Sequence, residues 1–269
     1  MKSVFSIKRP VIGMIHVGAL PGTPSSRTDV ATLAMQAAAE AVVYKKSGVD
    51  AVMLENMHDV PYLRGTVGPE IVAAMTRVAD AVKTVFVGPV GIQVLAAANR
   101  EALAIALVAE LSFIRAEGFV FAHVADEGFI QSCAADLLRY RRQIGADHVQ
   151  VWADIKKKHS SHAITADISL AATAEAAEFM QADAVIVTGG VTGEPPTEDD
   201  VKAAKDGASL PVVLGSGIGA DNITDFWPYA DAFIIGTAFK KSGDWRNPPD
   251  PRRIVQFMKI VKRLRKESP

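Results

Sequence analysis

The sequence predicts a single (β/α)₈ barrel spanning residues 1–269, an α/β fold in which eight parallel strands alternate with eight helices. Two observations lead to this prediction. Short runs of β-branched and aliphatic residues recur eight times along the chain, and a helix-like segment follows each of them. These runs are continuously apolar, which is typical of parallel strands buried on both faces. The length is close to the ~250 residues of one such barrel, and no Gly/Ser linker or change of composition divides the chain.

Each expected strand is a short aliphatic run. In order they are Val11–Val17, Ala51–Glu55, Val90–Leu95, Phe113–Arg115, Val149–Ile155, Ala184–Thr188, Val212–Gly215 and Ala232–Gly236. Because a helix-length segment separates each run from the next, consecutive strands are expected to pair in parallel.

The expected helices are amphipathic or rich in alanine. In order they are Asp29–Lys46, Pro69–Lys83, Asn99–Glu110, Ile130–Ile144, Ile168–Gln181, Thr197–Asp206, Asp221–Trp227 and Asp250–Lys266. Pro69 suits the first position of the second helix, and Asn99 is expected to cap the third. Cys133 falls among alanines in the fourth and is expected to be a small core residue. The last helix has an apolar stripe and a solvated basic face, as an ordinary outer barrel helix has.

The alternative fold is an open doubly wound sheet. That fold would require a glycine-rich fingerprint after its first strand. After Val17 the chain reads Gly18-Ala19-Leu20-Pro21-Gly22, which lacks the G-x-G-x-x-G spacing. The barrel is therefore preferred.

Composition excludes several classes of protein. Apolar residues make up 49% of the chain, enough for a large core, and 29 Lys+Arg against 30 Asp+Glu argue against a nucleic-acid binder. A single cysteine excludes an intramolecular disulfide and a cysteine-based zinc cluster. Residues 1–10 contain no apolar signal segment, and charged residues interrupt every apolar run before a membrane-spanning length. We expect a cytoplasmic protein that is not inserted in a membrane.

Glycines follow the last two expected strands. Gly215-Ser216-Gly217 ends the seventh, and Gly236-Thr237 ends the eighth. Such loops present backbone N–H groups without obstruction by a Cβ atom, and paired loops at these strands commonly bind phosphate in barrels. These residues are therefore the predicted phosphate site. The alternative is that the glycines only form tight turns.

Carboxylates and imidazoles form a second group at the strand ends. Glu55 and Asp154 end apolar strands, where an unpaired buried charge is costly, and His16 ends the first strand. Together they could act as acid and base, or Glu55, Asp154 and His159 could bind a divalent metal. The alternative is a structural salt-bridge layer in which Arg115 and a lysine neutralise the carboxylates. The sequence leaves both interpretations open.

A basic cluster, Lys156-Lys157-Lys158-His159, follows the fifth expected strand. The simple interpretation is a solvated basic loop. Its position at the catalytic end of a barrel also suits contact with an anionic substrate, or a lysine that acts on a carbonyl. Under this second interpretation Lys158 and Arg115 stabilise developing negative charge.

Beyond these patterns, a set of loop motifs covers the whole chain. It comprises Gly13–His16, Ala19–Gly22, Val49–Ala51, Glu55–Tyr62 (ENMHDVPY), Gly88–Leu95, Phe113–Arg115, Tyr140–Arg142, Ala153–Ile155 with Lys158-His159, Ala182–Ala184, Thr188-Gly189, Thr192-Gly193, Gly215–Gly217 and Ile235–Thr237 with Lys240. With these motifs the chain resembles the BtpA/SgcQ family of (β/α)₈ barrels. The resemblance implies phosphate loops like those of ribulose-phosphate-binding barrels, and the family name implies a role in photosystem I biogenesis.

Two functions follow as hypotheses. The first is an enzyme, an isomerase, lyase or hydrolase, that acts on a small phosphorylated metabolite, with a cofactor that the sequence does not identify and a divalent metal compatible with its acidic residues. The second is a non-catalytic assembly or stability factor that binds a protein partner. By analogy with other barrels of this size, self-association through apolar helix faces is also expected.

Overall fold

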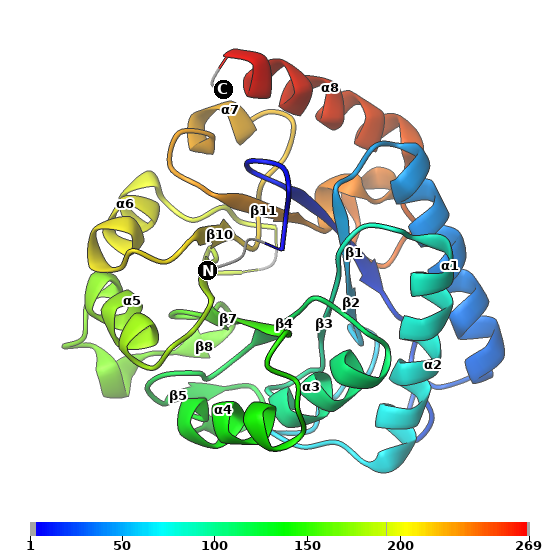
Figure 1. Cartoon of the computed structure of the whole chain (residues 1–269), viewed down its shortest axis with the longest axis horizontal. Coiled ribbons are helices and arrows are strands. Elements are labelled where there is room, and N and C mark those ends of the chain that lie inside the picture. Colours follow the sequence, from blue (N-terminus) through cyan, green and yellow to red (C-terminus); the bar gives the residue numbers. More distant parts are fainter. Residues whose placement is uncertain (1–3, 192, 268–269) are drawn as a thin grey trace.

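The computed structural model describes residues 4–191 and 193–267. Eight parallel strands close into a barrel, and the helices form a ring around it (Figure 1). The barrel strands are β1 (Val11–His16), β2 (Ala51–Glu55), β3 (Val90–Gln93), β4 (Phe113–Ala116), β7 (Gln150–Asp154), β9 (Ala184–Val187), β10 (Val212–Leu214) and β11 (Ala232–Ile235). β1 pairs in parallel with both β2 and β11, which closes the ring and confirms the predicted fold.

The helices occupy the outer layer. They are α1 (Val30–Lys46), α2 (Pro69–Val85), α3 (Asn99–Val108), α4 (Ala134–Gln143), α5 (Leu170–Phe179), α6 (Glu198–Gly207), α7 (Ile223–Phe226) and α8 (Pro251–Glu267), with short 3₁₀ turns η1 (Ala163–Thr165), η2 (Thr237–Phe239) and η3 (Lys241–Gly243). Local signals start several of them. The Asp29 carboxylate caps α1, and a reciprocal capping box between Thr197 and Asp200 begins α6. None of the helices in the described ranges is long and apolar enough to cross a membrane.

Two local predictions were wrong. The helix predicted over Ile130–Ile144 begins only at Ala134, because Ile130 belongs to a strand and Cys133 occupies the N-cap position. Asn99 does not cap α3. Its buried side-chain amide instead donates to the Glu117 carbonyl at 2.7 Å, and Ala98 occupies the N-cap position.

A small antiparallel sheet lies outside the barrel and was not predicted. Its strands are β5 (His123–Ala125), β6 (Gly128–Ile130) and β8 (Ser160–Ser161), in the order β6-β5-β8. It joins the loop after β4 to the loop after β7. The sheet therefore fixes the basic loop that follows β7.

The core has two layers. One fills the space between strands and helices, and the other fills the barrel interior. At the amino-terminal end of the barrel the rings of Phe113 and Trp152 stack with their centroids 4.0 Å apart, and Phe5 packs against both. Aromatic side chains therefore fill that end of the barrel. The polar residues that end the strands gather at the opposite end.

Candidate functional site

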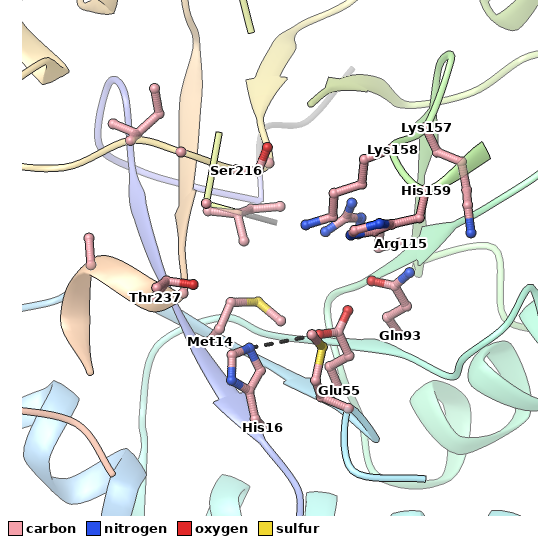
Figure 2. Close-up of a pocket in the computed structure, with 18 of the residues that line it drawn as sticks. Met14, His16, Glu55, Gln93, Arg115, Lys157, Lys158, His159, Ser216 and Thr237 are labelled. Atoms are coloured by element: carbon pink, nitrogen blue, oxygen red, sulfur yellow. Dashed lines mark ion pairs between the residues drawn. The ribbon is translucent and has the colours of Figure 1, made fainter. Parts of the chain in front are cut away.

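A cavity of about 460 Å³ lies at the carboxyl ends of the barrel strands. Side chains from β1 to β4, the loop after β7 and the loops after β10 and β11 line it (Figure 2). Cavities of a few hundred Å³ suit small metabolites. The lining includes nine of the ten residues predicted as catalytic or phosphate-binding: His16, Glu55, Arg115, Lys158, Gly215, Ser216, Gly217, Gly236 and Thr237. Asp154 lies behind this lining.

His16 and Glu55 face each other across the first two strands, where the register places them side by side. Nε2 of His16 lies 3.8 Å from Oε2 of Glu55 (dashed line in Figure 2). The other ring nitrogen, Nδ1, lies 2.9 Å from the Trp245 carbonyl oxygen. Because a carbonyl only accepts hydrogen bonds, Nδ1 carries the proton and Nε2 keeps its lone pair. The sequence did not indicate this role of Trp245.

Burial sets the charge states of this pair. It lowers the pKa of His16 to about 3, and the positive charge of Lys240 acts in the same direction. Burial also raises the pKa of the Glu55 carboxyl, although Arg115 opposes that shift. At neutral pH, His16 is therefore a neutral base whose Nε2 faces a carboxyl with an increased tendency to hold a proton.

We expect His16 to make the protein less stable in mild acid. Its folded pKa of about 3 lies below the unfolded value of 6.5, so the unfolded state binds the extra proton first. Above pH 6.5 His16 is neutral in both the folded and the unfolded state and does not reduce stability. Between pH 6.5 and 3 its protonation in the unfolded state lowers the free energy of unfolding by up to about 1.4 kcal/mol per pH unit. Urea unfolding between about pH 5 and 7 should show a smaller pH dependence for His16→Gln than for the wild type. His148→Gln, at an exposed position, is the control. An equal slope in all three proteins would contradict a buried neutral His16.

Arg115 and Asp154 form a buried bidentate ion pair. The Arg115 Nε and Nη2 atoms donate to the two carboxylate oxygens of Asp154 at 2.8 and 3.0 Å. The two side chains are only 6% and 1% exposed. Arg115 reaches the cavity, whereas Asp154 lies behind it. Of the two interpretations that the sequence left open for the carboxylates, the structural salt bridge applies to Asp154, which positions Arg115. A role as acid or base remains open for Glu55.

Neighbouring lysines of the basic loop have different roles. Lys157 binds the buried Glu117 carboxylate, with Nζ 3.1 Å from Oε1. Lys158 points into the cavity beside Arg115 (Figure 2). Burial, followed by the positive charge of Arg115, lowers the pKa of the Lys158 amine. Lys158 is therefore part of the pocket and not a solvated surface residue.

The three candidate metal ligands do not form a common site. Within the described ranges, no group of three His, Cys, Asp or Glu side chains is arranged to hold a metal ion. The Asp154 carboxylate is bound by Arg115, Glu55 faces His16, and His159 is exposed on the loop. This donor arrangement does not favour a resident metal.

Residues of the two glycine loops line the cavity. Gly217 and Ile218 follow β10, and Thr237 and Ala238 begin η2 after β11. In the described part of the chain, the N–H groups of these four residues have no protein acceptor. Backbone N–H groups without an acceptor, in glycine loops and at helix starts, are a common site for anions.

The Ser216 side chain has a structural role instead. Its hydroxyl accepts a hydrogen bond from the Gly189 N–H and donates one to the Glu194 carbonyl, both at 3.0 Å. These bonds fix the loop after β9 against the loop after β10. Any contact of Ser216 with an anion would therefore involve its backbone.

Several lining residues were missed by the sequence analysis, and Arg253 and Gln93 are two of them. Arg253 lies at the rim, where its Nε donates to the Ala238 carbonyl at 2.8 Å. The sequence does contain a signal for Arg253. Arg252 and Arg253 lie in the first turn of α8, where a positive side chain interacts unfavourably with the helix dipole, so their presence there suggests a functional reason. Gln93 ends β3 with a buried Oε1 atom that has no hydrogen-bond partner in the described part of the chain. Asp221 also lines the cavity, and the negative charge of its carboxylate disfavours the binding of an anion there.

Comparison with known proteins identifies the family of this chain. The BtpA family model matches residues 7–263. The chain is 46% identical over 272 residues to an uncharacterised mitochondrial protein of Caenorhabditis elegans, F13E9.13, with 99% of this chain and 98% of that protein covered. It is 34% identical to the photosystem I biogenesis protein BtpA of Synechocystis, with 98% and 92% covered.

Solved structures agree on the fold. Orotidine 5′-monophosphate decarboxylase of Methanocaldococcus jannaschii superposes with a TM-score of 0.57 over 95% of this chain and all of that one, at 14% sequence identity. A likeness at this identity shows the barrel fold alone. Together, the family match over most of the length and the full-length relatives establish that this chain is a member of the BtpA family.

Proposed function

We propose that this protein is an enzyme that acts on a small phosphorylated metabolite. The observation that supports this most is the group of four cavity-lining residues, Gly217, Ile218, Thr237 and Ala238, whose backbone N–H groups have no acceptor in the described part of the chain. Unpaired amides are costly unless water or a ligand satisfies them, and a phosphate supplies several acceptor oxygens at once. Arg253 adds a positive charge at the same end of the cavity.

The opposite side of the cavity supplies the groups for proton transfer. Nε2 of His16 is an unprotonated nitrogen with a fixed tautomer that accepts a hydrogen bond and is only weakly basic, and Glu55 is a carboxyl whose raised pKa favours the acid form. The Arg115 guanidinium, held by Asp154, is suited to stabilise negative charge that develops on a substrate oxygen. This set is suited to proton transfer beside a carbonyl, which isomerases and lyases both use.

The names of relatives bear on the two hypotheses in different ways. Orotidine 5′-monophosphate decarboxylase, which has the same fold, is named for a phosphorylated substrate. The name of the Synechocystis relative instead suggests an assembly factor. A surface that only binds a protein does not need a buried base, an acid and an arginine around one cavity. Cytoplasmic location and self-association stay predictions.

Arg253 provides a test of phosphate binding. Inorganic phosphate should raise the melting temperature of the wild-type protein, because a ligand stabilises the state that it binds. Arg253→Ala should weaken phosphate binding about tenfold, the effect of losing one charge-assisted hydrogen bond. Arg252→Ala is the matched control, since it removes an exposed arginine from the same helix turn. Titration by thermal shift and calorimetry measures both. No stabilisation of the wild type by phosphate, or equal losses in the two variants, would contradict the proposed site.

A further inference from the structure

Among the lysines near the cavity, Lys158 differs from its neighbours. Lys157 is paired with Glu117, and Lys240 is paired with Glu40 at 2.8 Å. Lys156 donates to the Thr165 carbonyl at 3.2 Å. The Lys158 Nζ atom has no hydrogen-bond or ion-pair partner within residues 4–191 and 193–267, and it points into the cavity (Figure 2). A partly buried amine that ends in a cavity without a carboxylate partner is not explained by the fold.

The surroundings of Lys158 favour its nucleophilic form. Burial, followed by the positive charge of Arg115, lowers the pKa of the Lys158 amine and disfavours the ammonium, although the carboxylates of Glu55, Asp154 and Glu117 act in the opposite direction. A neutral amine has a lone pair that attacks carbonyl carbon, and lysines in such surroundings form imines. Glu55 lies in the same cavity and interacts electrostatically with Lys158. The cavity therefore combines a nucleophile, an acid and a base.

We infer that Lys158 forms an imine with the carbonyl group of a phosphorylated hydroxy-aldehyde or hydroxy-ketone. This inference rests on the proposed function, because the phosphate site would hold one end of the substrate and direct its carbonyl toward Lys158. The buried Gln93 Oε1, which has no partner among the described residues, would accept a hydrogen bond from a substrate hydroxyl.

The step conserves atoms and electrons. The lone pair of the neutral Lys158 nitrogen forms a bond to the carbonyl carbon, and the displaced electron pair moves to the oxygen, which takes a proton from Glu55. The nitrogen returns a proton to the Glu55 carboxylate, which gives a carbinolamine. Glu55 then donates this proton to the carbinolamine hydroxyl, the C–O bond breaks, water leaves, and the nitrogen lone pair completes the C=N bond of a protonated imine that faces the Glu55 carboxylate. The net reaction joins an amine and a carbonyl with loss of one water, and no oxidant or reductant takes part.

Reductive trapping tests this inference. The full-length protein is incubated with glycolaldehyde phosphate, dihydroxyacetone phosphate or ribose 5-phosphate in the presence of cyanoborohydride, and modified peptides are identified by mass spectrometry. We expect a reduced adduct on Lys158 with at least one of these compounds. Labelling should be at least about tenfold higher than with the unphosphorylated counterpart, because charge-assisted contacts to phosphate raise occupancy. Lys156 and Lys157, on the same loop, serve as internal controls.

Two variants make the outcome decisive. Lys158→Arg keeps the positive charge and removes the nucleophile, and Lys158→Met serves if the arginine does not fit. Both should lose the adduct and keep stabilisation by inorganic phosphate. If phosphate stabilises the wild type but none of the three compounds labels Lys158, the imine is excluded and the proposed function stands. Labelling spread evenly over Lys156, Lys157 and Lys158 also excludes it. If phosphate gives no stabilisation, the proposed function itself fails.

Discussion

Replacing Asp154 by alanine is expected to lower the free energy of unfolding by about 3–5 kcal/mol, one of the largest effects in the molecule. The carboxylate is 1% exposed and binds the Arg115 guanidinium through two hydrogen bonds. Removing it leaves a positive charge in the barrel interior without its partner, and burial makes that charge costly. Urea unfolding followed by circular dichroism measures the change.

Two comparisons separate this effect from the loss of any ion pair. Asp147→Ala removes the partner of Arg142 in an exposed pair and should cost no more than about 1 kcal/mol. The double variant Arg115→Met/Asp154→Leu removes both buried charges and should recover most of the lost stability. An Asp154→Ala protein as stable as Asp147→Ala would show that Arg115 is not held as the structure describes.

Replacing Gly217 by alanine is expected to cost about 2–5 kcal/mol and to abolish stabilisation by phosphate. Gly217 has a φ of +69°, a conformation that side chains with a Cβ atom rarely adopt. A Cβ atom added there would also meet the backbone of Glu194 and Pro195 in the loop after β9. That backbone must shift, and the amides of Gly217 and Ile218 must move with it.

Gly145 provides the matched control. Its φ of +73° is nearly the same, but no atom lies within 4 Å of an added Cβ. Gly145→Ala should therefore cost only the conformational part, about 1–2 kcal/mol, and leave the phosphate response unchanged. Equal losses of stability in the two variants, together with an unchanged phosphate response, would contradict the close packing of the β9 and β10 loops.

The barrel was predictable because its signals are local. Each strand is a buried apolar run, and residues such as Asp29 and Thr197 start their helices with interactions three residues away. The sheet of β5, β6 and β8 was missed because its strands are two or three residues long and show no useful periodicity. Asn99 was misjudged for a related reason, since its contacts with the Glu117 carbonyl and the Cys133 sulfur depend on tertiary structure.

The residues of the site were largely predictable, but their roles were not. Strand ends identified Glu55 and Asp154 equally well, and only the structure shows that Arg115 binds Asp154. Ser216 was named as part of a loop that presents backbone N–H groups, and no signal in the sequence indicated that its hydroxyl fixes the loop after β9. Arg253 reaches the cavity from α8, far along the chain from the other residues there. Roles of this kind depend on distances between separate strands and loops, which the order of residues does not specify.

The most direct test of the proposed function is a crystal structure of the protein grown with inorganic phosphate at a concentration that saturates its thermal stabilisation. We predict one phosphate bound by the backbone amides of Gly217, Ile218, Thr237 and Ala238, with the Arg253 guanidinium at its outer side. A saturating phosphate found at another position, with these four amides still without an acceptor, would contradict the proposed function.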